Sequence, residues 1–194
     1  MVDSSGTVPE WLAKLLEWLY ENICKPAKEN KEKGRRKYDV PLFSQGSLSM
    51  CGAYCEVMIN SYHELDEIDQ ATADRLVKII GLIKNGANWN APVWPGNIGE
   101  RIHRSEITDI WVIYDALEEG PIYAIYDRPP DWTGESKAGH MVVVTGVDCS
   151  AGLVYTNNPW GIQAAQTFDE FLHHFTNGSD NWILGGIYPV EGIK

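Results

Sequence analysis

The chain has 194 residues, of which 44% are apolar, and a formal net charge of −11. This length allows one domain with a sizeable hydrophobic core and leaves room for a short appendage. Residues 41–194 carry eight basic and twenty acidic groups, which argues against binding nucleic acid through its phosphates and favours a basic substrate or partner surface.

No apolar run reaches the roughly 18 residues that a membrane-spanning helix needs. The N-terminus also lacks the basic, then apolar, then small-residue pattern of a signal peptide. We therefore expect neither membrane insertion nor a signal peptide. The four cysteines, at positions 24, 51, 55 and 149, have no Cys-x-x-Cys spacing. Such usage favours a reducing compartment in which the thiols stay free.

The first expected element is a helix near the N-terminus. Five apolar residues recur there at helical spacing and form a stripe that must pack on something: Trp11, Leu15, Trp18, Leu19 and Ile23. Residues 25–37 are a charged run with proline and glycine, typical of a linker or exposed loop. We therefore divide the chain into an amphipathic helix with a charged linker, 1–37, and a folded domain, 38–194.

A polar stretch that contains glycine ends at Met50, and the following residues, from Cys51 to Tyr62, are typical of a helix whose first turn holds Cys51. A thiolate is the reactive form of cysteine, and a helix N-terminus together with a neighbouring imidazolium lowers a thiol's pKa. Gln45 lies six residues before Cys51. If the chain doubles back, its side-chain NH2 and the Cys51 backbone N–H can form an oxyanion hole.

A second helix is expected over residues 70–85, with Gly86 as its stop. Its proposed buried face consists of Ala73, Leu76, Val77, Ile80 and Ile83. Residues 88–99 hold two tryptophans, two prolines and two glycines, and we expect a loop that lines a substrate cleft. Residues 108–119 favour a helix, although 110–114 also fit a strand by composition.

The second half of the chain indicates a sheet. A strand is expected over 121–127, and residues 128–137 are an excursion before His140. His140 opens an apolar run to Val147, and after a turn at 149–152 a second strand completes a hairpin. Residues 182–189 supply a last strand. Helices first and an antiparallel sheet second predict an α+β fold.

The hairpin brings Asn158 back towards His140, so that its side-chain oxygen can hold the imidazole in its working tautomer. Trp160 could then shield that bond from water. Asn157 is the competing candidate for the orienting role. In the alternative interpretation, Asn158 only forms a turn before proline, and His140 is a core histidine with its hydrogen bonds satisfied.

Taken in order, Gln45, Cys51, His140 and the element Asn158-Pro159-Trp160-Gly161 resemble the papain-like cysteine peptidases. The resemblance is closest to the compact bacterial branch, which includes bacteriocin-leader peptidases and avirulence proteases of plant pathogens. It implies a papain-like fold, in which a helical half carries the nucleophile and an antiparallel sheet follows. The sequence departs from the branch in having Asn158 where aspartate is more common. Cys55, which the family does not require, is expected to pack in the core, since a disulfide to Cys51 would be strained.

The resemblance implies hydrolysis of peptide bonds in a protein substrate by a triad of Cys51, His140 and Asn158, with Gln45 in the oxyanion hole. No metal or organic cofactor is implied. It also implies a bacterial effector or interbacterial toxin that a secretion system delivers and that acts in the cytoplasm of the target cell. Such a toxin would have a cognate immunity or inhibitor protein covering its cleft.

Two alternatives remain. A peptidoglycan amidase of the thiol-hydrolase class would have Asp before the cysteine and Ser-Gly after it, whereas this chain has Met50 before it and Gly52-Ala53 after it. The second alternative is a binding module that keeps the fold but has no catalytic activity. The complete set of motifs argues against it.

Overall fold

The structure is a computed structural model that describes Leu12, Lys14, Leu15, Trp18 and residues 34–64, 67–88, 93–127, 139–175 and 186–190. The described helices are α3 (Cys51–Glu64), α4 (Gln70–Asn85), α5 (Ile110–Ala116) and α6 (Phe168–His173). The strands are β1 (Arg35–Lys37), β2 (Ile102–His103), β3 (Ile122–Tyr126), β4 (His140–Asp148), β5 (Leu153–Asn158), β6 (Ile162–Thr167) and β7 (Gly186–Tyr188).

Most of the expected N-terminal helix lies outside the described residues, as do residues 25–33 and 128–137. The four described residues near the N-terminus are helical. None of the described helices has the length and apolar content to cross a membrane.

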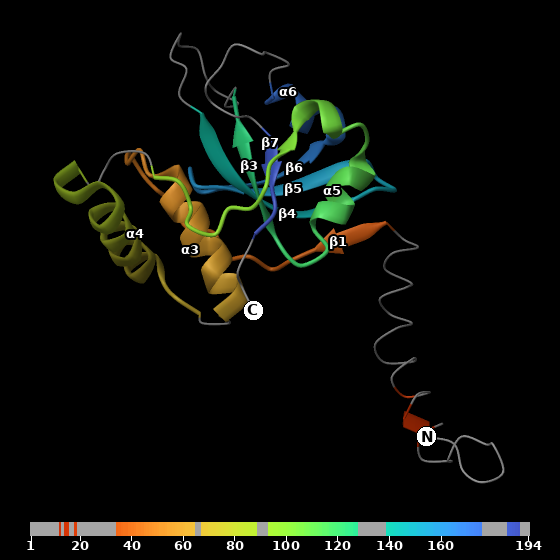
Figure 1. The fold of residues 1–194 in the computed structure, drawn as a ribbon, viewed down its shortest axis with the longest axis horizontal. Coiled ribbons are helices and arrows are strands. Elements are labelled where there is room, and N and C mark those ends of the chain that lie inside the picture. The colour runs from red at the N-terminus through yellow and green to blue at the C-terminus, as the bar shows by residue number, and fades with distance from the viewer. Residues whose placement is uncertain are drawn as a thin grey trace.

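The sheet is antiparallel throughout, with the order β2-β7-β3-β4-β5-β6 and β1 paired to β4. Figure 1 shows α3 with α4 on one side of it and α5 with α6 on the other. Side chains alternate along β3: Tyr123 and Ile125 pack with α3, while Ile122, Ala124 and Tyr126 face α5 and α6. Burial on both faces explains the continuous apolar runs of β3 and β4. The expected α+β fold with an antiparallel sheet is confirmed.

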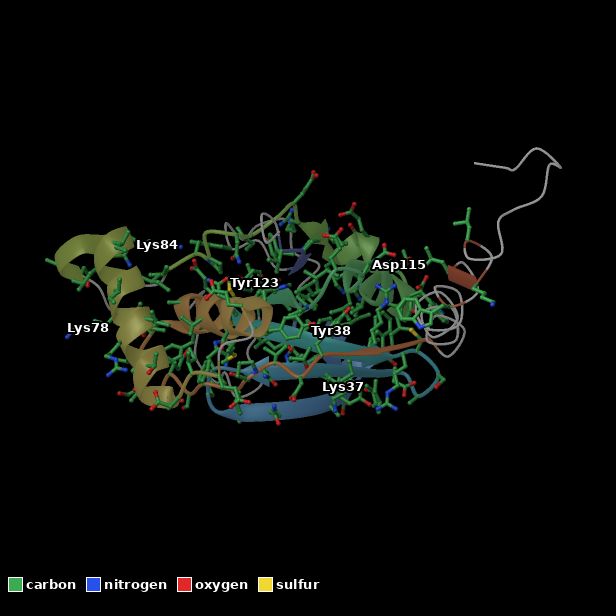
Figure 2. All side chains as sticks on the ribbon, turned by 90° about the horizontal axis from the view of Figure 1, so that it is seen from below. Lys37, Tyr38, Lys78, Lys84, Asp115 and Tyr123 are labelled. Atoms are coloured by element: carbon green, nitrogen blue, oxygen red, sulfur yellow. The ribbon has the colours of Figure 1, made fainter. Side chains whose placement is uncertain are left out.

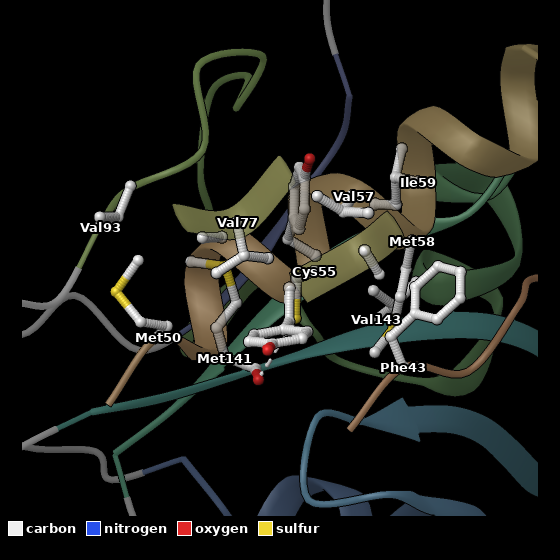
Figure 3. Close-up of a cluster of buried hydrophobic side chains, with 14 of the residues drawn as sticks. Phe43, Met50, Cys55, Val57, Met58, Ile59, Val77, Val93, Met141 and Val143 are labelled. Atoms are coloured by element: carbon white, nitrogen blue, oxygen red, sulfur yellow. Dashed lines mark hydrogen bonds between the residues drawn. The ribbon is translucent and has the colours of Figure 1, made fainter. Parts of the chain in front are cut away.

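Helix α3 runs through the core between the sheet and α4. Cys55, Met58 and Ile59 are fully buried along it, and Figure 3 shows them among the packed apolar side chains. The Cys55 thiol donates a hydrogen bond to the Met141 carbonyl of β4 at 3.4 Å. Cys55 therefore packs in the core, as expected, and helps to fix α3 against the strand that begins at His140.

Helix α4 matches its predicted bounds, with the Asp69 side chain capping its N-terminus through the Thr72 backbone N–H. The prediction of its buried face was wrong in part, because Leu76 is 39% exposed and Ile83 is 78% exposed. Figure 1 shows α4 on the outside of the molecule, where α3 is the described helix against which it packs. The small residues Ala73 and Gly81 lie in the buried strip of the helix.

Strand β1 places residues 35–37 in the sheet, although the sequence predicted a linker there. Arg36 pairs with Val147 and Lys37 with Gly146 of β4. A side chain at Gly146 would collide with this strand, since its Cβ would lie 2.5 Å from the Arg36 carbonyl oxygen. The register of β4 with β5 also shifts at Gly146, as in a β-bulge. A glycine in an apolar strand was the available signal for this close approach.

Candidate active site

Cys51 is the first residue of α3 and follows the fully buried Met50. Cys51 itself is half-buried. Burial raises the pKa of its thiol, and hydrogen bonds with the backbone of Met141, Gly52 and Cys51 itself oppose that rise. Backbone N–H donors lower a thiol's pKa because they stabilise the thiolate. Helix α3, which begins at Cys51, packs against β4, the strand that begins at His140.

The N-terminus of α3 is also in close contact with the loop before Ile98. A Cβ on Gly52 would lie 1.9 Å from the Val93 carbonyl oxygen, so only glycine allows the loop to approach here. The Tyr123 hydroxyl donates to Asn97 at 2.6 Å, and Asn97 donates to Asn60 at 3.1 Å. These bonds fix the described part of the loop that the sequence predicted at 88–99.

His140 is the first residue of β4 and is 5% exposed. Its Nε2 lies 2.8 Å from the Oδ1 of Asn158, the last residue of β5. The Trp160 ring stacks on the imidazole, with the ring centroids 4.3 Å apart and the planes inclined by 25°. Both contacts were predicted from the hairpin, and the structure brings the three side chains together.

The tautomer of His140 follows from a second contact of Asn158. The Trp160 backbone N–H, which can only donate, bonds the same Asn158 Oδ1 at 2.9 Å. That atom is therefore the acceptor, and His140 Nε2 must donate to it. A neutral His140 then carries its proton on Nε2 and leaves the Nδ1 lone pair available as a base.

Asn157, the competing candidate, makes other contacts. Its Nδ2 donates to the carbonyls of Val40 at 2.8 Å and Pro41 at 3.4 Å, and its Oδ1 accepts from Gln163 at 3.2 Å. These bonds fasten β5 to the segment that leads towards Gln45. Successive side chains on a strand point to opposite faces of the sheet. Asn157 and Asn158 are consecutive in β5, so the Asn157 side chain points to the face opposite to that of Asn158.

Gln45 is buried and is held at three points. Its backbone N–H donates to the Pro159 carbonyl at 2.6 Å, and its carbonyl accepts from the Leu48 N–H at 3.1 Å. Its side-chain NH2 donates to the Leu48 carbonyl at 2.6 Å, while its Oε1 is buried without a hydrogen-bond partner. The NH2 group has a second hydrogen for another acceptor. The contact between Gln45 and Pro159 ties the nucleophile segment to the turn after Asn158, which the sequence did not reveal.

Burial lowers the pKa of the His140 imidazole, the hydrogen bond to Asn158 raises it, and the nearby His174 lowers it. Burial thus favours the neutral form of both His140 and Cys51. This differs from the sequence expectation of an imidazolium that lowers the thiol's pKa. Proton transfer from thiol to imidazole charges both groups together, so the two charges can stabilise each other.

The described residues contain no group of three or more His, Cys, Asp or Glu side chains placed to hold a metal ion. A cavity of about 260 Å³, lined by His63, Glu118 and Glu119 among others, lies at the opposite end of α3 from Cys51. It is separate from the candidate site.

A comparison with protein-family models matches residues 37–185 to the Peptidase_C39 like family. The chain belongs to that family. It is therefore a cysteine peptidase, and the predicted resemblance to papain-like enzymes is confirmed. No curated protein matches the chain. The family match spans all four candidate residues, while the role of each stays a prediction.

Proposed function

We propose that this Peptidase_C39-like protein hydrolyses peptide bonds in a protein substrate through Cys51, His140 and Asn158. The observation that carries the proposal is the 2.8 Å contact between His140 Nε2 and Asn158 Oδ1 beneath the stacked Trp160. It orients the imidazole at the start of β4, the strand on which the helix of Cys51 packs. Nucleophile, base and orienting group thus lie in adjoining elements.

In the first step, His140 Nδ1 takes the thiol proton and Cys51 attacks the scissile carbonyl carbon. The tetrahedral intermediate collapses when His140 gives that proton to the leaving amine, and an acyl-enzyme remains. Water, deprotonated by His140, then attacks the acyl-enzyme and releases the second product with the thiol restored. Asn158 Oδ1 accepts the hydrogen bond from His140 Nε2–H throughout and holds the ring in this tautomer.

The oxyanion of each intermediate would be bound by the Cys51 backbone N–H and the second hydrogen of the Gln45 NH2 group. Leu48 supports this role, because its carbonyl holds the first hydrogen and so fixes the amide plane. A donor held in this way would be in place before the substrate arrives, so that little reorganisation would accompany the reaction.

For biological context, we propose a bacterial effector or interbacterial toxin that acts in the cytoplasm of the target cell after delivery by a secretion system. Free thiols at Cys51, Cys55 and Cys149 suit a reducing compartment. Residues 41–194 have a strongly negative net charge, which suits a basic protein substrate. A basic immunity or inhibitor protein could cover the cleft for the same reason.

The test is to incubate the protein with a cytoplasmic protein extract and to identify new protein N-termini by mass spectrometry. Cys51→Ala is the control, and Cys149→Ala is the matched cysteine variant that should keep activity. Sites that appear with the wild type and Cys149→Ala but not with Cys51→Ala support the proposal. If no new N-termini appear and the protein instead releases stem-peptide fragments from peptidoglycan, the result would favour the alternative function as a peptidoglycan amidase.

A further inference from the structure

Helix α4 carries a second apolar surface on the side away from α3. Four of its residues are exposed, at 39% for Leu76, 51% for Ile79, 45% for Leu82 and 78% for Ile83. They recur at helical spacing and so form one stripe. Trp94, 52% exposed, lies near the end of the helix. We call these five residues the α4 face.

The α4 face is well anchored on the domain. Lys84 Nζ donates to the Trp94 carbonyl at 2.5 Å and pairs with Glu56 of α3 at 3.1 Å. At the other end of α4, Gln70 exchanges two hydrogen bonds with the backbone of Ser44, at 2.8 and 3.0 Å. A contiguous apolar patch on a rigid support is typical of a binding site for another apolar surface.

The charge of α4 differs from that of the domain around it. Three of the eight basic groups in residues 41–194 lie within α4, as Arg75, Lys78 and Lys84, against the single acidic Asp74. The helix therefore has a formal net charge of +2 in a strongly acidic domain. Lys84 is paired with Glu56 of α3, so the exposed Arg75 and Lys78 supply the positive charge for a partner. A partner for the α4 face should combine an apolar stripe with negative charge.

Residues 9–23 have both properties. The helix that the sequence predicts there has an apolar stripe of tryptophans, leucines and isoleucine, and residues 9–23 have a net charge of −2, from three glutamates and one lysine. Among the described residues, Leu15 is 44% exposed and Trp18 is 56% exposed. An amphipathic helix laid along an apolar surface is a recurring mode of recognition.

The position of β1 decides which copy of the chain supplies the segment. Figures 1 and 2 show α4, with Lys78, at one end of the long axis and β1, with Lys37, towards the other. Residues 24–33 span at most roughly 35 Å when fully stretched. A domain of this size is about 38 Å across, so the segment would have to go around the core to reach its own α4. We propose that the α4 face binds residues 9–23 of a second copy.

The test uses the full chain with the photoreactive residue p-benzoylphenylalanine in place of Ile83. Chains with the probe are labelled with ¹⁵N and mixed with unlabelled chains without it, and cross-linked peptides are identified by mass spectrometry. We expect cross-links from position 83 to residues 9–23 that join labelled and unlabelled peptides. The same probe at Ile162, which is 48% exposed on β6, should give no cross-link to residues 9–23.

Two variants test the chemistry of the contact. Leu15→Glu places a charge on the stripe and should lower the cross-link yield at least about tenfold. Lys14→Gln leaves the stripe intact and should keep the yield. Because Leu15 is exposed, circular dichroism should show an unchanged fold. Cross-links only within one chain, cross-links from position 83 to α4 of a second copy, or a yield that Leu15→Glu leaves unchanged would each overturn the proposal.

Discussion

His140 Nε2 donates to Asn158 Oδ1 at 2.8 Å, and the same oxygen accepts the Trp160 backbone N–H at 2.9 Å. Asn158→Ala removes the acceptor that fixes the tautomer. We expect kcat to fall at least roughly tenfold, but less than the roughly 100- to 10,000-fold typical of losing a general base. Peptide cleavage by the purified variant measures the loss.

Asn157→Ala is the matched control for that variant. It leaves the buried Val40 carbonyl without its 2.8 Å donor, so the free energy of unfolding should fall by about 1–3 kcal/mol. Activity per folded molecule should stay near that of the wild type. If Asn157→Ala lost activity and Asn158→Ala kept it, the orienting role would belong to Asn157.

Gln45 is the predicted side-chain donor of the oxyanion hole. Gln45→Glu keeps the shape and removes the NH2 group, so kcat should fall by about 100- to 1,000-fold with little change in KM. Leu48→Ala retains the backbone carbonyl that bonds Gln45 and serves as the control. A kcat that is unchanged in Gln45→Glu would remove Gln45 from the mechanism.

Trp160 stacks on His140, and we expect it to shield the imidazole from water. Burial lowers the pKa of His140, so Trp160→Ala should raise that pKa back towards its ordinary value. The protonated, inactive imidazole would then persist to higher pH, and the acidic limb of the pH–activity profile should move upwards. Trp160→Phe, which keeps an aromatic ring, should leave the limb nearly in place. A limb unmoved by Trp160→Ala would contradict the shielding role.

Gly52 tests the contact between the nucleophile helix and the loop at Val93. Gly52→Ala would place a Cβ 1.9 Å from the Val93 carbonyl oxygen. Overpacking of this kind should lower the free energy of unfolding by about 1–3 kcal/mol or more. At Gly96 the nearest atom to an added Cβ is Glu56 Oε1 at 3.4 Å, and Gly96→Ala should be tolerated. If chemical denaturation gave the two variants the same free energy of unfolding, the loop at Val93 would be able to move away from Gly52 at no cost, contrary to the expected close contact.

The sequence predicted the features that depend on local patterns. The start of α3 at Cys51 follows from a polar stretch that gives way to helical periodicity, and the β4–β5 hairpin follows from two apolar runs around a turn. Once that hairpin was predicted, the meeting of His140 and Asn158 was predictable too. These features require only neighbours in the chain.

Other features depend on contacts between distant segments and could not be predicted. The bond from Gln45 to the Pro159 carbonyl joins two loops, and no periodicity encodes it. Strand β1 was missed because its sequence, Arg-Arg-Lys, is charged. It can pair with β4 because Gly146 has no side chain that would collide with the backbone of Arg36. The exposure of Leu76 and Ile83 depends on how little of α4 the rest of the domain covers.

The environment of Cys51 is the remaining difference from expectation. The sequence placed it at a helix N-terminus, where its pKa should fall, but burial outweighs the backbone donors and raises the pKa. Residue order gives the position of a thiol on its helix. The extent to which surrounding side chains exclude water from it emerges only from the packed fold.

The most direct test of the pairing between Cys51 and His140 is the pH dependence of Cys51 alkylation by iodoacetamide, measured by mass spectrometry. Burial lowers the pKa of His140 and raises that of Cys51. Between these two pKa values the fraction of thiolate–imidazolium pairs does not depend on pH. The rate should therefore be nearly constant from about pH 6.5 to about pH 8.5 and should fall only where His140 becomes protonated.

Two comparisons complete the measurement. In His140→Ala the rate should be low at neutral pH and rise about tenfold per pH unit through pH 9, as for a thiol without a base. Cys149, whose pKa is raised to about 11 by burial and by Asp148, is the internal reference for a slow thiol. A flat profile in the wild type and a steep one in His140→Ala is the predicted result. The same steep profile in both proteins would contradict the pairing.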